Sequence, residues 1–198
     1  NCTVSGADTG YIVEATGSGE PAAEYAAGGF IARSNSTNMS RCHAQNLKDV
    51  TADNVQGYAG GFVGISHTGD LAELGDLKDS EGKLIAVKDL LGAVDTMVPN
   101  YTNCTVTYVD GGGVAADVAG GFVGEMQSGK VNNQSRGEGK YYAVYNIDHV
   151  NGPTYAGGFG GKVYSGALAD AGGGISILGK NSELNITLTE LLNVVKAY

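Results

Sequence analysis

The stretch "YAGGFVG", residues 58 to 64, decides the fold class of this chain because close copies of it recur. Aligned on the phenylalanine, the other copies are "YAAGGFIA" around Phe30, "VAGGFVG" around Phe122 and "YAGGFGG" around Phe159. Successive phenylalanines are 32, 60 and 37 residues apart. A unit of about 32 to 37 residues, used four times with one insertion between Phe62 and Phe122, accounts for these intervals.

A second motif precedes each copy of the first. It reads "NCTV" at 1–4, "RCHA" at 41–44, "NCTV" at 103–106 and "YYAV" at 141–144. The second residue of this motif lies 28, 20, 18 and 17 residues before the phenylalanine in the four units. The spacing is regular except in the first unit, which is longer.

Each unit is predicted to contain an alternating strand such as "CTVTYV", a polar turn, and a second strand through GGF. Alternation places Cys104, Val106 and Tyr108 on one face of the first strand. A unit of this size cannot enclose its own core, so stacking of like residues on like residues is expected, as in a β-solenoid. The phenylalanines Phe30, Phe62, Phe122 and Phe159 would then form an interior ladder.

The glycine pairs before the phenylalanines are expected at a recurring corner, where positive φ or close backbone approach favours glycine. These core repeat glycines are Gly60, Gly61, Gly120, Gly121, Gly157 and Gly158. A phosphate-binding loop is the alternative, but the motif lacks the Lys-Ser/Thr pair and the helix start that such loops use.

Composition favours a mainly β chain that folds without metals or disulfides. There are 33 glycines and 3 prolines in 198 residues, with many Val, Ile, Tyr and Thr. The net charge of −9 disfavours nucleic acid and anionic membranes as partners. The chain has no apolar stretch long enough to cross a bilayer and no signal peptide at its start, so we interpret it as a mature or excised fragment of a larger protein.

The order of GGFVG, a glycine turn, Asn-Cys and an alternating strand resembles the GLUG repeat of bacterial surface proteins. The match covers most of residues 1–66 and 101–168. It departs at the insertion, at Tyr141-Tyr142 in place of Asn-Cys, and at Ala32 in place of a glycine. The resemblance implies a right-handed parallel β-helix in an exported, often wall-anchored, protein of the adhesin type.

Residues 70–100 lose the repeat, and apolar residues from Leu84 to Val94 follow a helical spacing. We expect a helical insertion that is either a binding element projecting from one face or a lid over a gap in the core. Residues 180–198 are predicted to cap the solenoid, either with a helix that begins near the capping box Thr187–Glu190 or with a final strand.

Three cysteines, Cys2, Cys42 and Cys104, occupy one repeat position and are expected to stack as a ladder. We favour buried thiols over disulfides, although adjacent strands would bring them within reach of strained bridges. A Cys42–His43 nucleophile is disfavoured because neighbouring strand residues face opposite sides.

Metal and cofactor sites are not predicted, because His43, His67 and His149 lie in different units without ligand spacing. The carboxylates that could line one side of the coils are Asp49, Asp53, Asp110, Asp117 and Asp148. We favour turn and surface roles for them, since spacing singles out no catalytic pair. Candidate tyrosines for sugar stacking are Tyr108, Tyr141, Tyr142, Tyr145, Tyr155 and Tyr164.

Asn-x-Ser/Thr sites begin at Asn1, Asn35, Asn38, Asn100, Asn103, Asn133 and Asn185. We attribute them to the Asn-rich turns and Thr-bearing strands of the repeat, with a glycosylated ectodomain as the alternative.

We therefore expect a single solenoid domain over residues 1–198, a monomer without enzymatic activity that serves as an adhesive module or stalk on a bacterial cell wall. Its partner would be a host or environmental glycan or an extracellular-matrix protein. The alternative is a carbohydrate-active β-helix enzyme, either a polysaccharide lyase or a glycoside hydrolase. Ice binding is a third hypothesis, for which only "CTVT" and "ITLT" supply threonine ranks.

Overall fold

The computed structural model describes residues 1–16, 24–53, 56–67, 98–127, 129–133 and 142–164. Every regular element within these ranges is a β-strand, and the strand pairs are parallel. No helix with the length and apolar character of a membrane span occurs in this part of the chain. The protein is therefore all-β, with parallel sheets, as the composition and repeat predict.

The strands form four sheets, which we call A to D. Sheet A contains β1 (Cys2–Ser5), β6 (Cys42–Asp53), β10 (Thr105–Ala115) and β14 (Val144–Tyr145), with β2 (Tyr11–Thr16) beside β6 and β15 (His149–Asn151) beside β10. Sheet B contains β3 (Tyr25–Gly28), β7 (Gly57–Gly60), β11 (Val118–Gly120) and β16 (Tyr155–Gly157). Sheet C contains β4 (Ile31–Asn35), β8 (Val63–His67), β12 (Val123–Gln127) and β17 (Gly160–Tyr164). Sheet D contains β5 (Asn38–Ser40), β9 (Asn100–Thr102) and β13 (Lys130–Asn132).

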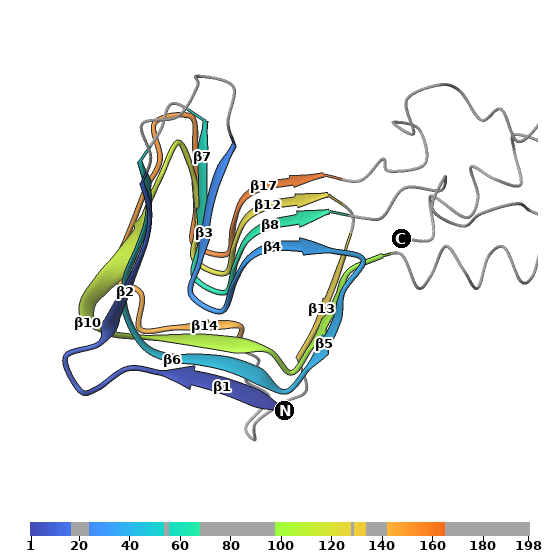
Figure 1. Ribbon diagram of the computed structural model, residues 1–198, viewed down its shortest axis with the longest axis horizontal. Coiled ribbons are helices and arrows are strands. Elements are labelled where there is room, and N and C mark those ends of the chain that lie inside the picture. Colours follow the sequence, from blue (N-terminus) through green and yellow to red (C-terminus); the bar gives the residue numbers. More distant parts are fainter. Residues whose placement is uncertain (17–23, 54–55, 68–97, 128, 134–141, 165–198) are drawn as a thin grey trace, which may run out of the picture.

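Within the described residues the chain visits sheets A, B and C in this order four times and reaches sheet D after each of the first three visits, and each visit lays its strands beside those of the previous one (Figure 1). We call each visit a pass. The register places the repeat copies on one another: Ala59 lies opposite Ala27 on one side and Ala119 on the other. Repeat copies that are far apart in the sequence thus lie next to each other in the structure.

The unit is richer in strand than the prediction of two strands and a polar turn. β6 and β10 continue, with a bend, through the stretch predicted to be a turn, so Asp49 lies within a strand. Sheet D supplies a further strand between GGF and the Asn-Cys position, which the prediction missed. The reason is that each of these strands is only three residues long, with one apolar residue between two polar ones, which is too short for a recognisable alternating pattern.

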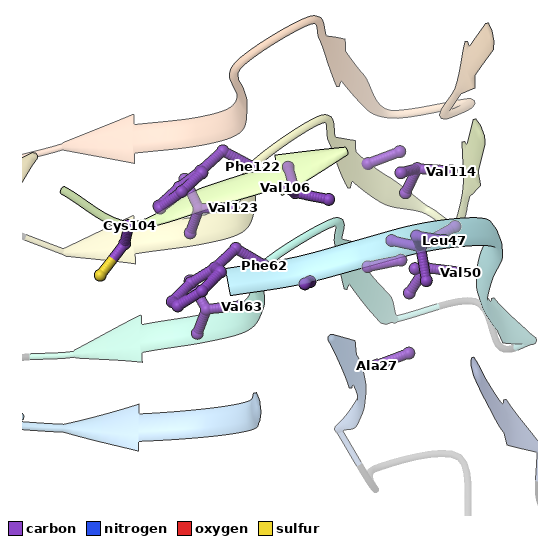
Figure 2. Packing of buried hydrophobic residues seen from close by; sticks show 14 of the residues in the cluster. Ala27, Leu47, Val50, Phe62, Val63, Cys104, Val106, Val114, Phe122 and Val123 are labelled. Atoms are coloured by element: carbon purple, nitrogen blue, oxygen red, sulfur yellow. The ribbon is translucent and has the colours of Figure 1, made fainter. Parts of the chain in front are cut away.

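One half of the core lies between sheet C and the first part of sheet A, which face each other in Figure 1 and are joined on one side by sheet D. The core continues between sheet B and the second part of sheet A. Phe62, Phe122, Val106 and Leu47 are fully buried there (Figure 2). The buried hydroxyl of Tyr101 also lies in this core, within hydrogen-bond distance of two serine hydroxyls of sheet C. The core therefore contains one satisfied polar network among apolar ladders.

Asparagine side chains tie neighbouring passes together where the long strands of sheet A bend. Asn46 and Asn146 both adopt the left-handed conformation, with φ of 55° and 58°. The amide of Asn46 donates to the Gly6 carbonyl at 3.2 Å, and that of Asn146 donates to the Tyr108 carbonyl at 3.1 Å. Asparagine suits this position because it tolerates positive φ and supplies a donor to the preceding pass.

Two irregularities of the repeat have definite positions. The extra residues of the longer first unit fall in two places, between β1 and β2 and between β2 and β3, as the register with β6 and β7 shows. The insertion falls between β8, which ends at His67, and β9, which begins at Asn100. The predicted helical stripe at 84–94 and the predicted cap at 180–198 lie outside the described residues.

Candidate functional site

At the GGF corner the backbones of neighbouring passes approach each other closely. Consecutive passes are linked there by backbone bonds such as Phe62 N–H to the Phe122 carbonyl at 2.8 Å. A Cβ on Gly61 would overlap the Tyr108 hydroxyl and the Gly121 carbonyl, and one on Gly60 would overlap the Val63 carbonyl. The glycines leave room for protein backbone and a tyrosine hydroxyl, which is a structural use of the motif.

The four phenylalanine rings stack in one column. Centroids are 4.8 Å apart from Phe30 to Phe62, 4.9 Å from Phe62 to Phe122 and 5.4 Å from Phe122 to Phe159, and the planes differ by 8° or less. The two middle rings are fully buried, while Phe159 at one end is 41% exposed. Of the remaining repeat glycines, Gly120, Gly121 and Gly157 are as crowded as Gly60, whereas a Cβ on Gly158 would have no atom within 4 Å.

The cysteines also share a column. Cys2 lies opposite Cys42 in register, and Thr105 lies opposite His43, so Cys104 follows Cys42 in the same column. All three are free thiols; Cys2 is exposed and the other two are buried. The ring of His43 bonds the Thr105 hydroxyl at 2.8 Å, in keeping with a separate face from the thiol.

The most concentrated polar chemistry in the described residues surrounds Glu125 on sheet C. Its carboxylate accepts a hydrogen bond from Lys162 Nζ at 2.9 Å and one from the Tyr164 hydroxyl at 3.2 Å. His67 Nε2 lies 2.9 Å from Oε1. We call Glu125, His67, Lys162 and Tyr164 the Glu125 cluster; it joins three passes of the chain.

The Glu125 cluster lies on the outer face of sheet C. Ser34 and Ser66, in the next column of the sheet, turn inward, since their hydroxyls lie 3.1 and 2.7 Å from that of buried Tyr101. Residues one position earlier face the opposite side because strand residues alternate. That outer column consists of Arg33, Ile65, Glu125 and Lys162.

Electrostatics keep Glu125 ionised. Burial alone would raise its pKa, because only 4% of the residue is exposed, but hydrogen bonds from His67 and Lys162 and the charge of Lys162 lower the pKa to about 2. The hydrogen bond to Glu125 raises the pKa of Lys162. Burial, followed by the Glu125 charge, raises the pKa of Tyr58 on neighbouring sheet B. A carboxylate that is ionised and already bonded to three partners is poorly suited to donate a proton as a general acid.

The sequence prediction missed the Glu125 cluster, although a signal was present. Its column lies three residues after each repeat phenylalanine and reads Arg, Ile, Glu, Lys through the four units. Opposite charges in adjacent units at one repeat position indicate an ion pair between passes.

The predicted carboxylates are only partly brought together. Asp49 lies 4.0 Å from His149 Nε2, and Asp148 lies 3.8 Å from His149 Nδ1. Asp117 accepts a bond from the Thr154 hydroxyl at 2.5 Å, and Asp110 is exposed. Among the described residues, no group of three or more His, Cys, Asp or Glu side chains could hold a metal ion.

His149 reaches Asp49 across an intervening pass. Gly113 of β10 lies between them in register, and a Cβ on Gly113 would overlap the imidazole ring. The missing side chain is what allows residues of the second and fourth passes to meet. His149 and Asp148 are well exposed, so this pair forms no enclosed site.

The tyrosines predicted to stack on sugars lie in different environments. Tyr108 is buried and donates to the Gly121 carbonyl at 2.9 Å, so it is a core residue and not a platform for ligands. Tyr142, Tyr145 and Tyr155 are exposed on the fourth pass, where the first two rings make an edge contact. Tyr164 is part of the Glu125 cluster, and Tyr141 lies outside the described residues.

Comparison of the chain with family models, with curated proteins and with solved structures finds no match.

Proposed function

We propose that this chain is a segment of a right-handed parallel β-helix that serves as a structural or adhesive module of a bacterial cell-surface protein. The observation that carries the proposal is the phenylalanine ladder, continuous through four passes. Identical stacking contacts repeated along one direction extend a rigid body, which suits a stalk or an adhesive surface. The right hand follows from the strong preference of parallel crossover connections.

The hydrogen bonds of the buried polar groups support a role without catalysis, because these bonds join neighbouring passes. Glu125 is the only buried carboxylate among the described residues, and its partners come from neighbouring passes. Such bonds strengthen stacking. His149 and its neighbours Asp49 and Asp148 are partly or well exposed, so they form no pair of carboxylates enclosed from water. We accordingly propose a protein without cofactor, acting through binding, in place of the polysaccharide lyase or hydrolase alternative.

The proposed ligand is a glycan or an extracellular-matrix protein, and the proposed binding element is the insertion 70–100. The chain leaves β8 at His67, a member of the Glu125 cluster, and returns at buried Val98 and Pro99 before β9. His67 before the insertion, and Val98 and Pro99 near its end, thus belong to the stacked strands, which we call the framework. We propose an extracellular, wall-associated location and a monomeric state for the same module.

The test is binding of the purified chain to arrays of glycans and matrix proteins. It is repeated with residues 70–97 replaced by a short Gly-Ser linker, which keeps Val98, Pro99 and β9. Saturable binding that the deletion abolishes, while the β-type circular dichroism spectrum persists, is the expected result. A chain carrying Glu24→Gln, an exposed framework change, is the matched control and should bind normally.

Other outcomes discriminate the alternatives. Progressive loss of an arrayed glycan, with release of shorter saccharides, would replace the proposal by the enzyme. Binding that survives the deletion would move the adhesive site to the framework, where the exposed tyrosines of the fourth pass become the next target. Absence of binding on every array would leave the stalk role.

A further inference from the structure

The cysteine column contains one aligned pair with an exposed member, since Cys2 is exposed and Cys42 is buried. Cys2 begins β1 and Cys42 begins β6, and the two residues are opposite each other in register. Neighbouring parallel strands lie about 4.8 Å apart, inside the Cα separation of about 4.4 to 6.8 Å that disulfides span. The strand pairing therefore already provides the backbone spacing for a bridge.

The third thiol, Cys104, is the most deeply buried of the three, since Cys42 is 8% exposed and Cys104 is not exposed at all. Cys104 is fully buried, and its Sγ lies 3.6 Å from the Met39 carbonyl and 3.7 Å from the Thr102 carbonyl. Burial raises the pKa of Cys104 to about 11, so its reactive thiolate form is scarce at neutral pH. Cys2, by contrast, is exposed at the edge of sheet A, and every residue of β1 is exposed.

We propose that Cys2 and Cys42 form a disulfide between the first and second passes when the chain meets a low-molecular-weight disulfide such as oxidised glutathione, and that Cys104 stays a thiol. The inference is independent of the proposed function. The Cys2 thiolate attacks the glutathione disulfide, which forms a mixed disulfide and releases one glutathione thiol. The Cys42 thiolate then attacks the Cys2 sulfur and releases the second glutathione, so two protein thiols are oxidised as one glutathione disulfide is reduced.

The bridge would fasten an exposed edge strand. In the part of the chain that the structure describes, β1 pairs with β6 alone. Closing a loop of about 40 residues restricts the unfolded chain, so the oxidised protein should melt about 5 to 10 °C above the reduced protein. A strained bridge would reduce this gain.

The test is treatment of the folded, reduced chain with oxidised glutathione. Free thiols are then alkylated in denaturant, and the chain is digested and mapped by mass spectrometry without reduction. The expected product is a Cys2–Cys42 crosslinked peptide, two hydrogens lighter than the sum of its parts, with Cys104 alkylated. A Cys42–Cys104 crosslink, or Cys2 left as a mixed disulfide with glutathione, would overturn the proposal.

Two variants make the assignment specific. Cys104→Ser should still form the crosslink and show the rise in melting temperature. Cys2→Ser, a change at an exposed position, should fold normally, form no internal crosslink and melt at the same temperature with and without the oxidant. A crosslink or a melting shift in Cys2→Ser would contradict the pairing. Absence of the Cys2–Cys42 crosslink from Cys104→Ser would contradict it as well.

Discussion

The rings of Phe62 and Phe122 stack with centroids 4.9 Å apart and planes 8° apart, although the insertion lies between them in the chain. The stack continues to Phe30 and Phe159 at similar spacings. A long interruption of the sequence repeat thus leaves the spatial repeat intact. The framework and the insertion are accordingly separable in experiments.

Removing a ring from the middle of the ladder should be costly. Phe62→Ala deletes a fully buried ring with neighbours on both sides, and we expect a loss of about 3 to 5 kcal/mol in the free energy of unfolding. Urea denaturation followed by circular dichroism measures this loss. Phe159→Ala is the matched control, because it removes the same ring at the exposed end and should cost about 1 kcal/mol. Equal costs at the two positions would argue against an enclosed ladder.

The corner glycine should tolerate a methyl group in one repeat and not in another. Gly61→Ala would press its Cβ against the Tyr108 hydroxyl and the Gly121 carbonyl, while nothing lies within 4 Å of the same atom in Gly158→Ala. We expect Gly61→Ala to lower the melting temperature by several degrees and Gly158→Ala to leave it within about 1 °C. Similar melting curves for the two variants would show that close approach does not explain the glycine.

The Glu125 cluster predicts an acid-dependent loss of stability. The pKa of Glu125 is about 2 in the folded chain against an ordinary value of 4.5. Because the folded value is the lower one, the unfolded chain takes up the proton first as pH falls. This stabilisation is complete above pH 4.5 and is lost as pH falls toward 2; the shift corresponds to about 3 kcal/mol.

Glu125→Gln should therefore lower stability at neutral pH and flatten the stability curve in the acid range. The control is Glu24→Gln, which breaks the exposed pair with Arg33 and should change stability by less than about 0.5 kcal/mol. Denaturation midpoints measured through the acid range test both variants. If the stability curve of Glu125→Gln keeps the full acid slope of the wild-type curve, the slope belongs to other carboxylates.

The bend asparagines predict a graded response to substitution. Asn46→Gly keeps easy access to φ of 55° but loses the bond to the Gly6 carbonyl, which should cost about 1 kcal/mol. Asn46→Ala loses the bond and also strains the backbone, for a total of about 2 kcal/mol. If alanine proves no worse than glycine in urea denaturation, the left-handed backbone is not what selects asparagine.

Much of the architecture was predictable because the repeat consists of glycine and phenylalanine, and each of these residues has few structural roles. The interval between GGF copies predicted the stacking, and the burial of Cys104, Val106 and Tyr108 follows their alternation. The polar strands of sheet D and the strand character around Asp49 were missed. Their apolar alternation is too short to be recognised in the sequence, and their strand form depends on backbone bonds to neighbouring passes.

The candidate site was less predictable, because it is assembled between passes. Nothing local to Glu125 distinguishes it from a surface carboxylate; it is buried and ionised because His67 and Lys162 arrive from other units. The contact of His149 with Asp49 likewise depends on the absent side chain of Gly113 in the pass between them.

The sequence by itself determined the all-β parallel class, the number of repeats and the phenylalanine column, since these follow from periodicity and from the properties of glycine and aromatic residues. Only the tertiary structure decided which residues of different passes meet. The register of neighbouring strands sets those meetings, and register depends on the whole stack of backbone hydrogen bonds and packed rings. A shift of one residue would have separated Glu125 from Lys162 and Cys2 from Cys42, while leaving the motifs in the sequence unchanged.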